Sequence, residues 1–344
     1  MKEDFALIIG INDYTLPGDN GLATLKGAIN DANKFEEWVI NPQGGNVPAS
    51  NSYKVISQPE PNLSPIQDQI DDKFLSIEKS LKNLIASGNS ARRLYFYFAG
   101  HGLGTLDSVT DTALVLANWS ELRRHSAISS EGYKDVIRQY GYFEEIIFIV
   151  DCCRNIKINV KPKHPSFSPP IPSPNSGATK LFVGYATHYQ DQSFEIETGN
   201  SEMRGVFTKV FLDGLNGGAI NSEGIIDADS LRNYLIKETP TEAIKKGYKQ
   251  IPEIINTFTN NTPFILTSNL INKDIKCIIK FDTNRNSIEL INGNAESVRT
   301  FDAREQKTFE ILLSKGLFLL RDTLTEETKV INISTLNEEI YVNF

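Results

Sequence analysis

The chain contains little cysteine and no excess of basic residues. Its three cysteines, Cys152, Cys153 and Cys277, are too few for a disulfide framework. Two of them are adjacent and would pair only with strain, so we expect a reducing, cytoplasmic location. The formal net charge of −8 lacks the basic excess that a nucleic-acid-binding surface usually shows. We therefore expect no nucleic-acid partner.

Long hydrophobic runs are also missing. No apolar stretch approaches the roughly 20 residues that cross a bilayer. The first residues, 1–5, lack the charged, apolar and cleavage regions of a signal peptide. The four histidines and three cysteines show no zinc-ligand spacing. The sequence therefore predicts neither a membrane segment nor a metal cofactor.

Short apolar runs alternate with amphipathic helical segments over most of the chain. This alternation predicts βαβ units, and hence an α/β fold with a mostly parallel sheet and helices on both faces. Strands are expected at 5–11, 52–57, 93–98, 146–150, 180–186 and 264–267. Helices are expected at 25–40, 66–86, from 129 or 130 through 137, 206–215 and 228–237. The run 113–117 is either a further strand or an antiparallel extension.

A proline-rich stretch interrupts this pattern. Six prolines lie between residues 162 and 174, and they exclude a helix or a central strand. We predict an exposed, flexible linker at 156–178 that divides a large part, 1–155, from a small part, 179–268.

The texture changes again near residue 269. Short strand-like runs separated by Asn, Asp and Gly turns predict a small all-β domain over 269–344. The runs are 275–281, 287–291, 306–312, 316–321, 329–333 and 339–344. The domain has no motif that we can assign. It either docks substrate, senses a ligand or holds a partner, or it only covers an apolar edge of the sheet.

Reactive side chains follow two of the most apolar predicted strands. His101 comes just after 93–98, and Cys152 and Cys153 come just after 146–150. The carboxyl ends of parallel strands meet at one edge, where open α/β folds place their sites. An imidazole at that edge would activate a thiol for nucleophilic attack.

Backbone amides would complete such a site. The amides of Gly102 and Cys153 are candidates for an oxyanion hole. Taken singly, a Gly-His-Gly turn or a buried cysteine needs no catalytic role. Because successive strand residues point to opposite faces, only one of Cys152 and Cys153 meets His101. The alternation alone does not say which.

Several segments resemble, in order, the caspase-like peptidases of family C14, and especially their metacaspase and bacterial branch. They are Phe5–Tyr14, Leu25–Ala32, Tyr97–Gly102 and Val150–Cys153, followed by 192–195 and 205–208. The resemblance covers roughly residues 4–268. It implies a caspase-like fold for 1–268, with the β-rich domain at 269–344 as an accessory.

The resemblance also implies roles for individual residues. The family pattern Asp-x-Cys makes Cys153 the nucleophile beside His101 and leaves Cys152 in the core. Asp31 and Asp151 fall on metacaspase positions that line an acidic S1 pocket, which would favour Arg or Lys at P1. Without the resemblance, both carboxylates would be given ordinary structural roles.

The implied function is a cysteine endopeptidase that cleaves proteins after Arg or Lys. By analogy with bacterial family members, it would be a regulated effector of antiphage defence or cell death, switched on by a small-molecule signal or a partner protein. The alternatives are a catalytically silent caspase-fold scaffold or ligand-binding module, and a protease that stays latent until a ligand reaches the β domain.

Some residues depart from the family pattern or leave questions open. Arg154 and Asn155 replace the His-Ser-Gly that commonly follows the nucleophile in metacaspases. Asp107 and Asp111 alone do not make the acidic cluster of calcium-dependent members, so calcium dependence is not expected. Lysines in or near the linker would allow self-cleavage by a basic-specific enzyme, or the linker is a passive lid. These lysines are Lys161, Lys163 and Lys180.

Overall fold

The computed structural model describes thirteen segments of the chain. They are 2–14, 22–58, 64–155, 159–198, 201–221, 224–257, 275–281, 285, 287–293, 295–304, 306–314, 316–333 and 339–344. The chain divides into two compact units, Met1–Leu212 with Asp227–Leu266, and Asp213–Ile226 with Thr267–Phe344. The predicted boundary at 268/269 and the predicted strand 264–267 lie outside the described residues, so the domain limits stay a prediction.

A six-stranded sheet forms the centre of the first unit, in the order β11-β8-β7-β3-β1-β2. Its strands are β1 (Lys2–Gly10), β2 (Ser52–Ile56), β3 (Ser90–Ala99), β7 (Glu145–Asp151), β8 (Lys180–Tyr185) and β11 (Glu253–Asn256). The first five run parallel, and β11 pairs antiparallel with β8 at the edge. Their near-continuous apolar runs are buried on both faces, as parallel sheets require.

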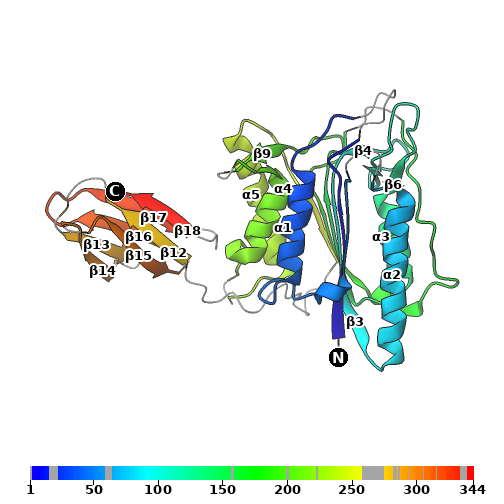
Figure 1. The fold of residues 1–344 in the computed structure, drawn as a ribbon, viewed down its shortest axis with the longest axis horizontal. Coiled ribbons are helices and arrows are strands. Elements are labelled where there is room, and N and C mark those ends of the chain that lie inside the picture. Colours follow the sequence, from blue (N-terminus) through cyan, green and yellow to red (C-terminus); the bar gives the residue numbers. More distant parts are fainter. Residues whose placement is uncertain are drawn as a thin grey trace. The chain divides into compact units, whose positions relative to one another are not determined.

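Five helices cover this sheet. They are α1 (Ala28–Ile40), α2 (Gln67–Ala86), α3 (Ser130–Gln139), α4 (Val206–Asp213) and α5 (Ala228–Lys245). Figure 1 shows α1, α4 and α5 on one face and α2 and α3 on the other. The predicted α/β class, a mostly parallel sheet with helices on both faces, is confirmed. Helix α5 continues eight residues beyond its predicted end at 237, through Pro240, because a proline removes only one helical N–H bond.

Short elements decorate the carboxyl edge of the sheet. The strands β4 (Gly102–Gly104), β5 (Thr112–Val115) and β6 (Ala127–Ser129) form an antiparallel sheet, and β9 (Glu195–Glu197) pairs with β10 (Met203–Gly205). The run 113–117 is thus the antiparallel extension. Three single-turn elements complete the set, η1 (Ala49–Asn51), η2 (Pro174–Ala178) and the π-turn η3 (Gly214–Gly218).

The proline-rich linker is packed rather than free in its described part, 159–178. Phe167 is 6% exposed, and its ring stacks on Phe74 of α2 at 4.3 Å. Both the amide and the hydroxyl of Ser166 donate to the buried carboxylate of Asp71. The expectation of a flexible linker is therefore wrong here. Prolines prevent regular ladders, but they do not prevent apolar side chains from burying.

The three candidate cleavage lysines are held by the fold. Lys163 donates its amide to Ala127, and Lys161 donates its amide to the His125 ring. Lys180 is the first residue of β8. Cleavage at these positions would require the chain to detach first, because a protease binds its substrate in an extended, accessible form.

The second unit contains two small sheets around one apolar core. One has the order β15-β12-β18 and the other β14-β13-β16-β17. The strands are β12 (Ile275–Lys280), β13 (Ser287–Asn292), β14 (Ser297–Asp302), β15 (Thr308–Leu313), β16 (Gly316–Asp322), β17 (Thr328–Ile333) and β18 (Glu339–Asn343). Strand β14 was not predicted. It is an edge strand with only Phe301 buried, so it lacks the alternation that identifies a strand.

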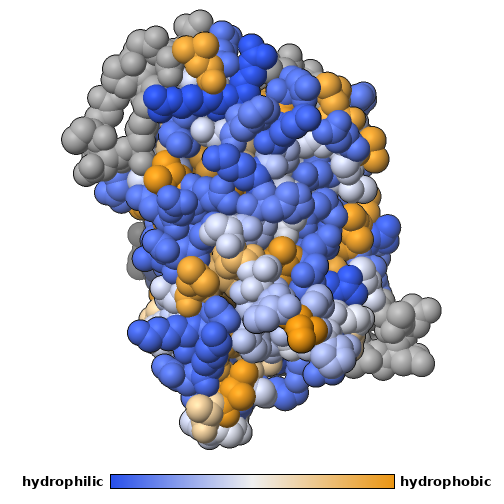
Figure 2. Space-filling view, turned by 90° about the vertical axis from the view of Figure 1, so that its right-hand side faces the viewer, coloured by the Kyte–Doolittle hydropathy of each residue, from blue (hydrophilic) through white to orange (hydrophobic). Residues whose placement is uncertain are grey.

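Within the described residues, no helix is long and apolar enough to cross a membrane. Figure 2 shows that the described residues on the face viewed there are mostly hydrophilic, with apolar side chains scattered among them. Scattered apolar residues are normal on a protein surface and need no partner.

Candidate active site

The ends of β3 and β7 bring the two reactive side chains to one cavity. Ala99 lies opposite Asp151 in the parallel register, and the amide of Gly100 donates to the Asp151 carbonyl at 3.2 Å. His101 and Cys153 each follow two residues later. Both line a cavity of about 320 Å³ at this edge of the sheet.

The His101 imidazole is fixed from two sides. Its Nε2 lies 2.7 Å from the Ala23 carbonyl oxygen, and its ring packs at 4.7 Å against the ring of Tyr14. The backbone amide of His101 donates to the Tyr14 hydroxyl at 2.7 Å. Because a carbonyl only accepts, the proton of the neutral imidazole sits on Nε2, and the lone pair sits on Nδ1. Nδ1 is therefore the basic atom of the ring.

The two adjacent cysteines have opposite environments. Cys152 is 1% exposed, and burial raises the pKa of its thiol well above the ordinary value. Cys153 is partly buried and lines the cavity, with the Ser193 amide donating to its Sγ at 3.4 Å. A protein amide pointing at sulfur favours the thiolate, the form that attacks. The structure thus places Cys153 at the cavity and Cys152 in the core.

Gly102 packs tightly beneath this site. A Cβ at this position would collide with the sulfur of Cys152, so only glycine fits. Val115 donates its amide to the His101 carbonyl, which makes 101 and 115 a hydrogen-bonded pair of the β4–β5 ladder. Pairs alternate in an antiparallel ladder, so the amide of Gly102 points away from β5. Its next like-facing neighbour, Gly104, donates to the carbonyl of Asn155.

Asp31 of α1 is buried and already has a cationic partner. The guanidinium of Arg204 donates from Nε to Asp31 Oδ1, and the amide of Gly205 donates to Oδ2 at 2.6 Å. Burial raises the pKa of Asp31 well above its usual value, while the Arg204 charge opposes that rise. Asp31 lines the cavity, but part of its charge is compensated by the chain itself.

Asp151 lines the same cavity without a cation on its carboxylate. The amide and hydroxyl of Thr208, in the first turn of α4, both donate to Oδ2, at 3.0 and 2.7 Å. Burial raises the pKa of Asp151 to about 6, against the lowering effect of the Thr208 bonds. A Cβ at Gly205 would collide with carboxylate oxygens of both Asp31 and Asp151, so the segment 204–208 is the cradle of both acids.

An apolar wall completes the cavity. Phe194 and Tyr248 both line it, and their rings stack at 4.3 Å with an angle of 7° between the planes. Glu195, next to Phe194, accepts the amides of Lys26 and Gly27 and so ties β9 to the start of α1. Figure 1 shows β4 and β9 at the same end of the sheet. The cavity therefore combines acidic groups with exposed aromatic surface.

Arg154 anchors the chain directly behind the nucleophile. Its side chain is 0% exposed and pairs with Glu253 of β11. It also donates to Thr112 Oγ1 at 2.9 Å and to the Val109 carbonyl at 3.0 Å, and it lies 4.3 Å above the Tyr185 ring. This one residue connects three segments that surround the Cys153 backbone.

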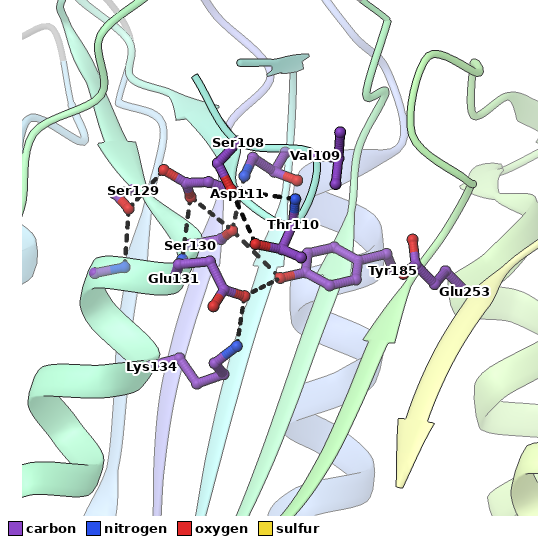
Figure 3. Close-up of polar contacts among 12 residues, drawn as sticks. Ser108, Val109, Thr110, Asp111, Ser129, Ser130, Glu131, Lys134, Tyr185 and Glu253 are labelled. Carbon is purple, nitrogen blue, oxygen red and sulfur yellow. Dashed lines mark hydrogen bonds and ion pairs between the residues drawn. The ribbon is translucent and has the colours of Figure 1, made fainter. Parts of the chain in front are cut away.

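Asp111 is used as a helix cap. Its carboxylate accepts hydrogen bonds from the hydroxyls of Ser129 and Ser130 and from the amide of Glu131 at the start of α3 (Figure 3). Carboxylates stabilise helix N-termini in this way. Among the described residues, no group of three or more His, Cys, Asp or Glu side chains is arranged to hold a metal ion.

The comparison with protein families decides the classification. A family model described as the caspase domain, of peptidase family C14, matches residues 3–263. The chain belongs to the caspase-domain family of peptidases. This confirms the resemblance found in the sequence motifs.

Two similar proteins illustrate the breadth of this caspase-domain family. A probable protease of a Desulfuromonadales bacterium is 29% identical over 270 residues, which are 74% of this chain and 32% of that protein. The chain thus spans about a third of the length of that relative. The solved structure of pro-sf-caspase-1 is 12% identical, covers 79% of this chain and 93% of its own, and has a TM-score of 0.43.

Several site features lie outside what the motifs predict. Arg204 directly precedes the 205–208 segment, but nothing in the sequence links it to Asp31, 173 residues away. The Ala23 carbonyl and the Ser193 amide are backbone groups, which carry no residue signal at all. Phe194 lies within the 192–195 segment, yet its ring contact with Tyr248 depends on the tertiary fold.

Proposed function

We propose that this chain is a cysteine endopeptidase that uses Cys153 and His101 and cleaves after Arg or Lys. One observation carries the proposal: the half-buried thiol and an imidazole whose tautomer is set by the Ala23 carbonyl line the same cavity. Membership in the caspase-domain family supports the same chemistry.

In the proposed reaction, the Cys153 proton passes to Nδ1 of His101. The thiolate then attacks the scissile carbonyl carbon, and a C–S bond forms. The imidazolium returns its proton to the leaving amine as the C–N bond breaks. A water molecule, deprotonated by His101, then hydrolyses the thioester and frees the thiol.

The oxyanion would be stabilised by the amides of Gly102 and Cys153. The outward direction of the Gly102 amide, away from β5, supports this role. Preorganised amides cost no reorganisation as the charge develops, and one such donor is worth about 100- to 1000-fold in kcat.

The preference for a basic P1 residue rests on the two acids. Asp31 and Asp151 both line the cavity, and Glu195 adds a third carboxylate against the single guanidinium of Arg204. The surplus of negative charge would attract an ammonium or guanidinium group. Neutral and acidic P1 residues would gain nothing from it.

The test is turnover of peptides with P1 Arg, Lys, Asp or Leu by wild type and by two neighbouring cysteine variants. Wild type should cleave the Arg and Lys peptides, Cys153→Ala should lose all turnover, and Cys152→Ala should retain much of it. Loss of activity in Cys152→Ala with retention in Cys153→Ala would refute the assignment. An inactive wild type that still binds the peptides would favour the silent scaffold.

We further propose a cytoplasmic, regulated role in antiphage defence or cell death, which rests on analogy with bacterial caspase-like proteins. The second unit, with its own apolar core, offers a separate place for an activating ligand or partner protein. Peptidase assays with and without extract from phage-infected cells test this. Equal rates under both conditions would contradict a switched enzyme.

A further inference from the structure

The stacked rings of Phe194 and Tyr248 offer a surface that the proposed chemistry does not use. Both residues line the cavity that contains Cys153. Phe194 directly follows Ser193, whose amide contacts the nucleophilic sulfur. Tyr248 is 38% exposed, although its ring is held against Phe194 at 4.3 Å. The pair therefore presents aromatic surface within one residue of the reacting atoms.

We propose that Phe194 and Tyr248 form a subsite for a large apolar side chain at P2, the substrate residue on the amino side of P1. This inference rests on the proposed peptidase function and adds to it a second determinant of substrate choice. The occupant is a leucine-sized or aromatic side chain of the bound peptide.

The two rings are held in place before any substrate binds. The amide of Phe194 donates to Gln250 Oε1 at 3.0 Å, and Gln250, itself buried, donates to the Ala186 carbonyl at 3.0 Å. The Phe194 carbonyl accepts the amide of Val206, the first residue of α4. The back of the Phe194 ring packs against a small apolar cluster that includes Val206. Phe194 is thus fixed through its backbone and its ring.

Tyr248 is fixed by the end of α5. Gly247 has a φ of +80°, in the left-handed region that glycine tolerates, and the amide of Tyr248 donates to the Ala243 carbonyl at 3.0 Å. A wall that is already ordered loses little conformational entropy on binding, so apolar contact with it yields affinity.

The order of strands in the sheet decides which side of the scissile bond meets the rings. His101 follows β3, Cys153 follows β7, Phe194 lies beyond β8 and Tyr248 precedes β11, while the sheet order is β11-β8-β7-β3. His101 must protonate the leaving amine, so the P1′ side lies toward β3. The acyl side, with P1 and P2, then lies toward β8 and β11, where the rings are.

The experiment varies P2 and P1′ separately in peptides with P1 Arg. For wild type, P2 Phe or Leu should raise kcat/KM about 10- to 100-fold over P2 Gly, as expected for filling an apolar pocket. The Tyr248→Ala variant should lose most of this ratio, chiefly through KM, while Tyr248→Phe should keep it because the ring remains. A wild-type preference at P1′ instead of P2 would overturn the assignment.

Tyr142→Ala is the matched control. Tyr142 is also a stacked tyrosine, with its ring 5.4 Å from that of Tyr140, but it precedes β7 and lies at the opposite end of that strand from the cavity. Its P2 ratio should equal that of wild type. A P2 ratio that survives in Tyr248→Ala would overturn the subsite. Wild type that cleaves P1 Arg peptides without any P2 preference would overturn the subsite alone, whereas wild type that cleaves none of them would overturn the peptidase function itself.

Discussion

Replacing Arg154 with Met should damage both stability and catalysis, because this buried side chain connects the nucleophile to three neighbouring segments. Met preserves most of the side-chain volume but removes the charge and all donors. The loss leaves Glu253 without its cation, and it leaves the Val109 carbonyl and the Thr112 hydroxyl without a donor.

The magnitude follows from these three losses. Removing one partner of a buried ion pair costs about 3–5 kcal/mol. The side chain of Glu253 is 35% exposed, so water offsets part of that cost and the lower end applies. The abandoned acceptors add about 1 kcal/mol, which gives a total of about 4 kcal/mol. For a unit of this size, that corresponds to a fall in Tm of about 10 °C.

The catalytic effect comes from the position of Arg154, one residue after Cys153. Its backbone is bonded to Asp191 and Gln190, while its side chain holds the surrounding loops. A shift of about 1 Å in a reacting group costs about 100-fold in rate. We therefore expect kcat/KM for a P1 Arg peptide to fall about 100-fold when it is measured well below the Tm.

Arg93→Met is the matched control for this experiment. Arg93 is another buried arginine, paired with Glu145 at 2.7 Å, but it lies at the start of β3 rather than at its catalytic end. This variant should lose comparable stability and keep the wild-type kcat/KM below its Tm. Thermal unfolding and peptide kinetics on both variants give the answer. Equal kinetic losses in the two variants, or none in Arg154→Met, would refute the positioning role.

Two further predictions concern charge and packing. The pKa of Asp151 is raised to about 6 by burial, so the carboxylate is ionised above that pH and neutral below it; KM for a P1 Arg peptide should therefore rise as pH falls through about 6, and this rise should be absent with an uncharged citrulline P1 and in Asp151→Asn. Because a raised pKa means that the fold disfavours the ionised form, Asp151→Asn should be at least as stable as wild type at neutral pH, and a KM that is flat across this range would contradict the role of Asp151. Phe167→Ala should cost about 3–4 kcal/mol in chemical denaturation, since it removes a buried ring stacked on Phe74, and unchanged stability would show that the linker is not part of the core.

Much of the first unit could be predicted because its elements are strongly periodic. The stripe of α2, with Ile70, Phe74, Ile77 and Leu81 buried, has helical spacing that the sequence shows directly. The strand before Cys153 is a continuous apolar run, which only a strand buried on both faces explains. Reactive residues at the ends of such strands then follow from topology.

The remaining features depend on contacts between distant residues. The Asp31–Arg204 pair joins α1 to β10 across 173 residues, and its effect is to compensate an acid that the motif alone leaves uncompensated. The packed linker depends on a carboxylate, Asp71, whose partners appear only when α2 and 159–178 meet. Such tertiary pairings leave no local pattern of spacing or composition.

The most direct test of the central claim is covalent labelling with a peptide electrophile that carries Arg at P1, followed by mapping of the modified residue by mass spectrometry. A thiolate beside its base at an accessible cavity should react at Cys153 alone, and His101→Ala should slow the labelling by orders of magnitude. Labelling at Cys152 or Cys277, or labelling of Cys153 at the same rate without His101, would contradict the account.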